Sequence, residues 1–282
     1  MRKIQQSDRH RVTVLPYGAP KTGKTRLTAA CNRGLEEQFG EQSLYICVDP
    51  DSTDLMLSGM LPEDAERMIP IQPVPDLDSL KGEPLIIGKK PAGNYSPLME
   101  AQLIATYNWQ REYPNVKTII IDTFTEWCEL FLMEAALLEA APADAKEGRV
   151  AFGRRGKVEF HVSPSRSDYL VAQGLTMRVI RNLLNQPMNV ICVFHEAYVE
   201  SINRGGPAAI GKALVQSLPG KFQHTVHLTS KKDKFMAHNS NHGVFLAGGR
   251  SPSAKPMQDL QLNADPVNFW VEYGKALRGE LK

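Results

Sequence analysis

The stretch Gly18-Ala19-Pro20-Lys21-Thr22-Gly23-Lys24-Thr25 decides the fold of this 282-residue chain. It follows the apolar run Val12-Thr13-Val14-Leu15 and precedes a helical pattern that starts near Lys24. The spacing G-x-x-x-x-G-K-[ST], placed between a strand and a helix, is that of the Walker A phosphate-binding loop. A chance match in a Gly/Lys-rich turn is the alternative, and the flanking strand and helix argue against it.

The loop has the chemistry that a nucleoside triphosphate requires. Its glycines let successive backbone N–H groups turn inward around phosphates, and the following helix adds its positive dipole end. We therefore expect residues 18–26, through Arg26, to bind ATP, with Lys24 reaching the β- and γ-phosphates. The Thr25 hydroxyl is expected to ligate Mg²⁺.

Two further apolar runs end in polar residues and extend this prediction. Val116–Asp122 is a β-branched strand ending in an acid, the Walker B pattern, so Asp122 is expected to hold Mg²⁺ through water opposite Thr25. The alternative is an ordinary strand whose Asp caps a helix over Phe124–Ala141. Met188–Phe194 ends in His195-Glu196, where a γ-phosphate sensor would lie if this strand is central. The alternative there is a strand that simply leaves the core.

Composition fits one globular α/β domain, with 42% hydrophobic and 23% charged residues. We expect a cytoplasmic protein without a membrane partner, because no apolar run approaches the ~20 residues that span a bilayer. The polar N-terminal residues do not resemble a signal peptide. The four cysteines are expected to be reduced and buried. Zinc at the later histidines is disfavoured, because His224 and His227 are three apart in a strand-like run and point to opposite faces.

Charge is unevenly distributed although the net charge is only +2. Residues 47–80 are acidic, whereas residues 146–166 and 202–234 are basic. Two basic segments on one chain indicate a polyanionic partner, although solvated charge is the alternative.

The remaining pattern predicts a short series of further elements. Helices are expected over Lys24–Gln38, Pro97–Tyr113, from Ser167 or Asp168 to Asn185, and after Asp265-Pro266; strands over Ser43–Asp49, Phe222–Thr229 and Gly243–Ala247; a flexible Gly/Pro loop over Arg204–Lys212; and a loop or hairpin over Pro142–Arg166.

Together these motifs resemble the core ATPase domain of RecA-type recombinases. The resemblance covers about residues 10–250 and is carried by GAPKTGKT at 18–25, VDPDS at 48–52, IIIDT at 119–123, VFHE at 193–196 and GGPAAIGKAL at 205–214. More narrowly, the chain is similar to small phage P-loop ATPases of the Sak type, which are linked to single-strand annealing. The resemblance implies a mostly parallel sheet flanked by helices. It further implies a core over residues 1–250, with insertions at about 50–97 and 142–166, and an antiparallel C-terminal extension with a helix over 251–282.

The resemblance also assigns catalytic roles. The carboxylate that activates water would be Asp51, in the turn Asp49-Pro50-Asp51. Because Asp is one methylene (about 1.5 Å) shorter than the Glu usual in this family, Glu126 or Glu196 could act instead. His195 would be the γ-phosphate sensor.

DNA contacts and contacts between subunits follow from the same resemblance. Residues 198–212 would bind single-stranded DNA through Arg204 and Lys212. Apart from the resemblance, the basic residues Arg154, Arg155 and Lys157, with Phe152 nearby, form a second stretch that could hold phosphates with aromatic support. Lys231, Lys232 and Lys234 would complete a neighbouring subunit's site in trans. Plain surface loops and a solvated lysine cluster are the alternatives.

The implied function is a DNA-stimulated ATPase that binds single-stranded DNA and promotes annealing or recombination in a phage-type system, in the cytoplasm of a bacterial host. It would act as a homo-oligomeric ring or filament, together with a single-stranded DNA-binding protein. An ATP-driven helicase or packaging motor is one alternative. A nucleotide-switched DNA-binding scaffold with incidental turnover is the other.

Overall fold

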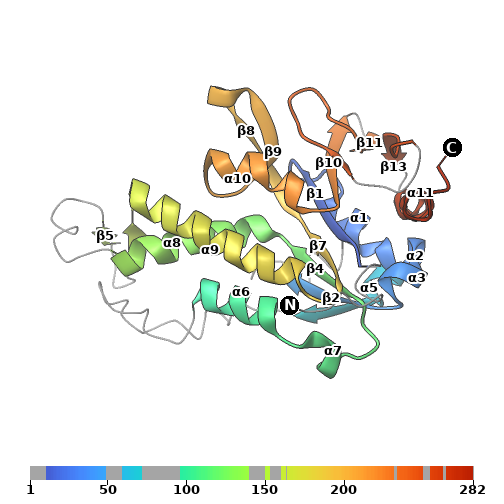
Figure 1. Ribbon diagram of the computed structural model, residues 1–282, viewed down its shortest axis with the longest axis horizontal. Coiled ribbons are helices and arrows are strands. Elements are labelled where there is room, and N and C mark those ends of the chain that lie inside the picture. Colours follow the sequence, from blue (N-terminus) through green and yellow to red (C-terminus); the bar gives the residue numbers. More distant parts are fainter. Residues whose placement is uncertain are drawn as a thin grey trace, which may run out of the picture.

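A mostly parallel sheet forms the centre of the molecule (Figure 1). The computed structural model describes residues 11–48, 59–71, 96–139, 150–152, 160–162, 164–231, 234–249, 255–262 and 265–281. Within these residues 11 strands join one sheet, whose main path is β13-β11-β10-β1-β7-β4-β2-β3. The predicted α/β class, with helices flanking the sheet and an antiparallel C-terminal part, is confirmed.

The bounds of the strands and helices are as follows. The strands of the large sheet are β1 Thr13–Gly18, β2 Ser43–Cys47, β3 Met68–Ile71, β4 Thr118–Asp122, β7 Asn189–Cys192, β8 Phe194–Val199, β9 Arg204–Pro207, β10 His224–Lys231, β11 Lys234–His238, β12 Gly248–Gly249 and β13 Leu260–Leu262. A separate antiparallel pair is formed by β5 Val150–Phe152 and β6 Phe160–Val162. The helices are α1 Lys24–Ala29, α2 Cys31–Gly34, α3 Glu36–Phe39, α5 Pro62–Ala65, α6 Pro97–Thr106, α7 Trp109–Glu112, α8 Phe124–Glu139, α9 Arg166–Leu184, α10 Gly211–Ser217 and α11 Val267–Arg278.

The strand order places the sequence motifs at one edge of the sheet. β10, β1, β7, β4, β2 and β3 all run parallel, so their carboxyl ends meet at the same edge. β7 lies between the P-loop strand β1 and the Asp122 strand β4. Its continuation β8 pairs with the end of β1, with His195 opposite Gly18. Because ligands of open α/β sheets bind at the carboxyl ends of the strands, this edge positions the candidate site.

Two apolar layers cover the sheet, and the alternation of side chains along each strand separates them. In β4, Ile119 and Ile121 face the layer formed by α6, α8, α9 and α10, whereas Ile120 faces the layer formed by α1, α2, α3 and α11. Figure 1 shows these helix groups on opposite sides of the strands. No helix in the described part of the chain is both long enough and apolar enough to cross a membrane.

Several predicted helices differ in detail from the structure. The helix expected over residues 24–38 is divided into α1, α2 and α3, and that expected over 97–113 is divided into α6 and α7. The predicted capping of α9 was correct for Asp168 and wrong for Ser167. Ser165 is the N-cap, and Asp168, at the third helical position, accepts a hydrogen bond from the Ser165 N–H in a capping box.

Several short strands were also missed, β9 and β11 among them. The strand expected over residues 243–247 was wrong, because β10 pairs antiparallel with β11 and with β12, which begins only at Gly248. The loop expected over 204–212 instead contains β9, which pairs with β8, and the start of α10. Buried Gly205 and Gly206 permit this pairing, since a Cβ at these positions would lie 2.3 Å from the Phe245 ring and 2.7 Å from the Val215 carbonyl oxygen, respectively.

Candidate functional site

The P-loop, residues 18–25, leaves the sheet between β8 and β10 along a path that needs glycine. A Cβ on Gly18 would lie only 2.3 Å from the carbonyl oxygen of Leu228 on β10. Gly23 has a φ of 85°, in the left-handed region that glycine adopts without strain. The loop is therefore held close to β10 and turned sharply into α1.

The Lys24 ammonium group closes the loop on itself. Its Nζ donates to the carbonyl oxygens of Gly18 at 2.9 Å and Ala19 at 2.8 Å. Burial lowers the pKa of Lys24, while the negative charges of Asp122 and Glu196 act in the opposite direction. Lys24 is thus a buried cation near two acids, and its present partners are loop carbonyls that a phosphate can replace.

The Asp122 carboxylate lies beside the start of α1. The Thr25 hydroxyl donates to Asp122 Oδ2 at 2.7 Å, and the Tyr45 hydroxyl from β2 donates to the same oxygen at 2.9 Å. Asp122 is completely buried. Hydroxyl and carboxylate oxygens are the hard donors that Mg²⁺ prefers, so this pair fits the expected cation. Tyr45 was not predicted, because its position depends on the register of β2 against β4.

His195 and Glu126 approach each other at the same edge. His195 Nε2 lies 3.9 Å from Glu126 Oε1, and both side chains are partly exposed. Thr125 fixes the local backbone, since its Oγ1 accepts from the His195 N–H and donates to the Ala208 carbonyl oxygen, both at 3.0 Å. The strand end after β7 is thus tied both to the start of α8 and to the segment after β9.

Glu196 contacts His227, which the sequence pattern indicated only as a disfavoured zinc ligand. His227 Nε2 lies 3.0 Å from Glu196 Oε2, although the two residues come from β8 and β10, on either side of β1. The charge of Glu196 raises the pKa of Tyr17, for which burial is the larger cause. The spacing of histidines in β10 could not reveal this contact, which requires the strand order.

The other predicted residues are placed as follows. Asp51, Arg154, Arg155, Lys157 and Lys232 lie outside the described residues. Arg204 begins β9 and Lys212 lies in the first turn of α10, and both are exposed. Lys231 and Lys234 are exposed and paired across β10 and β11. A Cβ on Gly23 would lie 3.7 Å from the neighbouring Phe235 ring, so this strand pair lies beside its own P-loop.

Arg26 and the remaining loop residues do not all face the same way. Arg26 Nε donates to the Gly59 carbonyl oxygen at 3.0 Å, and Thr22 Oγ1 donates to Ala19 at 2.8 Å. Pro20 and Lys21 are exposed at the tip of the loop. The tip is therefore accessible, while its two ends are tightly held.

Comparison with known proteins adds a distant likeness. No protein-family model and no curated protein matches the sequence. Among solved structures, the chain is similar to the KaiC-like protein PH0186 from the hyperthermophilic archaeon Pyrococcus horikoshii OT3, at 12% sequence identity and a TM-score of 0.46. The match covers 91% of this chain and 87% of that chain. The fold and the site are defined by the strand order and the contacts above, not by this likeness.

The histidines of β10 point to opposite faces of the sheet, as their spacing predicts. His224 contacts Phe269 and Tyr273 of α11, whereas His227 stacks with Tyr17 and Phe245. Within the described ranges, no group of His, Cys, Asp or Glu side chains has the arrangement of a metal site. The four cysteines are buried and not bonded to one another.

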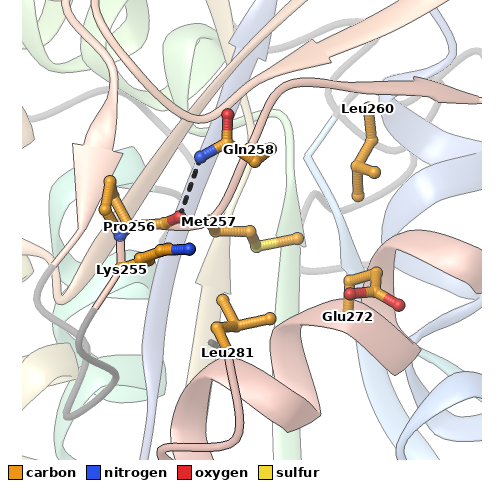
Figure 2. A pocket seen from close by; sticks show the side chains of 7 residues that line it. All are labelled: Lys255, Pro256, Met257, Gln258, Leu260, Glu272 and Leu281. Atoms are coloured by element: carbon orange, nitrogen blue, oxygen red, sulfur yellow. Dashed lines mark hydrogen bonds between the residues drawn. The ribbon is translucent and has the colours of Figure 1, made fainter.

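A pocket of about 110 Å³ lies away from these residues, between α11 and the segment around β13 (Figure 2). Met257, Leu260 and Leu281 converge on it, with Lys255, Pro256, Gln258 and Glu272 completing its lining. It shares no residue with the P-loop or the Asp122 region, so we do not assign the nucleotide to it.

Proposed function

We propose that this chain binds ATP with Mg²⁺ at the P-loop and hydrolyses the γ-phosphate. The observation that carries the proposal is the 2.7 Å contact between Thr25 and Asp122, beside the buried ammonium group of Lys24. A RecA-like nucleotide site needs these three groups within reach of one triphosphate. They come from β4 and from the start of α1, and the fold brings them to one edge.

The residues have separate tasks in this reaction. Lys24 exchanges its bonds to the Gly18 and Ala19 carbonyls for bonds to phosphate oxygens, and the loop N–H groups bind the remaining phosphate charge. Thr25 and Asp122 hold the cation, and Tyr45 orients Asp122. When bound, Mg²⁺ supplies neutralisation of the charge that develops on the β- and γ-phosphate oxygens. Water activated by a carboxylate attacks phosphorus in line, with Asp51, Glu126 and Glu196 as the candidates.

We further propose that the ATPase acts on single-stranded DNA, promoting annealing in a phage-type system as a homo-oligomer. Support comes from the strand pair β8–β9, which extends directly from His195 at the P-loop to an exposed surface. That strand pair carries the exposed Arg204 side chain, with Lys212 on the adjoining α10. Tyr198 is also exposed, but it pairs with Gly205, so its ring lies on the other face of the strand pair from Arg204. The cations are suited to backbone phosphates, and an exposed aromatic ring is suited to a stacked base.

Hydrolysis is tested by measuring phosphate release with and without single-stranded DNA. We expect stimulation by DNA in the parent, and loss of turnover in Lys24→Ala and Asp122→Asn. Lys221→Ala is the matched control, because this exposed lysine precedes β10 at the opposite edge of the sheet. Turnover that survives Lys24→Ala would overturn the site assignment. Asp51→Asn, Glu126→Gln and Glu196→Gln separate the candidate bases.

DNA binding is tested with oligonucleotides at several salt concentrations. If Arg204 and Lys212 each bind one phosphate, Arg204→Ala or Lys212→Ala should make the slope of log K against log salt shallower by about 0.7, whereas Lys221→Ala should not change it. An unchanged slope in both variants would exclude this surface as the DNA site. Strand unwinding would indicate a motor, and DNA binding that needs ATP but not turnover would indicate a switch.

A further inference from the structure

We propose that His227 is a positioning residue that holds the Glu196 carboxylate beside the P-loop, and that Glu196 is the group that activates water. This inference rests on the proposed ATP hydrolysis and selects one of its three candidate bases. It starts from the 3.0 Å contact between His227 Nε2 and Glu196 Oε2. The contact passes over β1, because β8 and β10 pair with β1 on its two sides.

The imidazole ring of His227 is fixed by its surroundings. Its side chain is 1% exposed, and its ring stacks with Tyr17 at 4.9 Å and with Phe245 at 4.3 Å between centroids. Tyr17 is itself held by a 2.6 Å hydrogen bond from its hydroxyl to the Leu246 carbonyl oxygen. A donor fixed in this way restrains the rotamer of a carboxylate more strongly than an exposed side chain could.

The hydrogen bond also fixes the protonation of the ring. A carboxylate that takes a proton from water is ionised beforehand and only accepts hydrogen bonds, so in this role His227 Nε2 carries the proton. Nδ1 is buried and has no hydrogen-bond partner among the described residues. A second proton on Nδ1 would have no acceptor there, and burial lowers the pKa of His227 more than the neighbouring Glu196 carboxylate raises it. His227 as a neutral ring therefore donates one hydrogen bond to Glu196.

Glu196 lies close to the P-loop, so its contact with His227 bears on ATP hydrolysis. Its side chain is 29% exposed and begins one residue beyond the pairing of His195 with Gly18. Its charge acts on Lys24, so the carboxylate and the P-loop ammonium group are electrostatic neighbours. A free carboxylate would be drawn into an ion pair with Lys24 and would compete with phosphate. The bond to His227 opposes that movement and leaves the other Glu196 oxygen available to water.

The proposed step balances as a hydrolysis. Water forms a bond to the γ-phosphorus, the bond from that phosphorus to the β–γ bridging oxygen breaks, and Glu196 accepts the proton that the water loses. That proton then passes to the released phosphate. His227 exchanges no proton in this step, and its part is to keep Glu196 Oε2 in place.

The test compares His227 variants that keep or remove the donor. His227→Leu should lower kcat by about 10- to 100-fold, as is typical when a partner that orients a reacting group is lost, with little change in KM. His227→Gln, whose amide can donate to Glu196, should recover most of this loss. In a Glu196→Gln background, His227→Leu should have less than about a twofold further effect, because the two residues act as one unit.

His224→Leu and His224→Gln are the matched controls, since His224 is a buried histidine of the same strand on the opposite face. If His227→Leu fails to fold, His227→Asn replaces it, because its shorter amide cannot reach Glu196. Equal kcat in the parent and in the donor-lacking variant would overturn the inference, as would an undiminished effect in the Glu196→Gln background. If the parent does not hydrolyse ATP, or Lys24→Ala retains turnover, the proposed function itself fails.

Discussion

At the scale of single residues, the Asp122 carboxylate depends on a tyrosine that lies outside both Walker motifs. Tyr45 donates to Asp122 Oδ2 at 2.9 Å from the neighbouring strand β2. Tyr45→Phe keeps the ring and removes this bond, so we expect the Mg²⁺ concentration for half-maximal hydrolysis to rise several-fold. Stability should fall by about 1 kcal/mol. Tyr273→Phe, on the buried face of α11, is the control, and an unchanged Mg²⁺ midpoint in Tyr45→Phe would contradict the assigned role.

The buried His224 ring makes stability depend on pH. Burial lowers its pKa from 6.5 to about 4, against the smaller effect of its hydrogen bond to Asn239. Above pH 6.5 the ring is neutral in both states. As pH falls from about 6.5 to about 4 only the unfolded chain takes up the proton, so stability is lost by about 1.4 kcal/mol per pH unit from this group. Urea unfolding at several pH values should show that His224→Gln loses less stability on acidification than the parent does. Equal losses of stability in the two proteins would contradict the prediction.

Sequence patterns could place only the residues whose roles depend on local spacing. Lys24 and Thr25 follow from one loop, and Asp122 follows from the end of one strand. Tyr45 and His227 contact the site through the order and register of strands far apart in the chain. No spacing within a segment encodes those contacts, so the sequence could not predict them.

At the scale of elements, the helix expected after the P-loop is divided where it meets α11. Gly34 ends α2, and a Cβ there would lie 2.6 Å from Trp270 Cβ and 2.9 Å from the Val267 carbonyl oxygen. Gly34→Ala should therefore lower the free energy of unfolding by about 1–3 kcal/mol through overpacking. Gly174→Ala, within α9 with nothing within 4 Å, should raise it by about 0.5–1 kcal/mol. Chemical denaturation measures both changes, and changes of the same sign would refute the packing argument.

The accuracy of the predicted elements follows from how each is stabilised. β1, β2, β4 and β7 are buried apolar runs whose sequence indicates a strand without reference to a partner. β9 contains two glycines and a proline, and β11 begins with lysine, so neither has strong strand propensity. Each pairs with a longer preceding strand, and this tertiary contact is what the local pattern could not show.

At the scale of the whole molecule, the C-terminal residues complete the sheet and one of its two apolar layers. β13 pairs with β11, and the Trp270 indole of α11 donates to the Leu27 carbonyl oxygen of α1 at 2.5 Å. The division of the chain at residue 250 stays a prediction. The contacts nevertheless place α11 directly behind the helix that begins with Lys24, so the stability of the P-loop and that of the C-terminal helix should be coupled.

Arg33 joins three segments that are far apart in the sequence. Its guanidinium group forms paired bonds to Asp64 of α5 at 2.9 and 3.1 Å, and to Asp265 before α11 at 2.5 and 2.8 Å. The Asp64 side chain is only 1% exposed, so Arg33→Leu leaves a buried carboxylate without its cation. Losing one partner of a buried ion pair costs about 3–5 kcal/mol.

The expected result is a loss of about 3 kcal/mol in urea unfolding for Arg33→Leu, with a weaker apparent affinity for ATP as the packing behind α1 loosens. Arg67→Leu is the control, because its partner Glu36 is exposed and such pairs contribute about 0–1 kcal/mol. Arg33→Leu combined with Asp64→Leu should recover part of the loss, since the uncompensated charge is gone. Equal losses of stability in the Arg33→Leu and Arg67→Leu variants would contradict this prediction. They would show that burial of Asp64 does not strengthen its ion pair with Arg33.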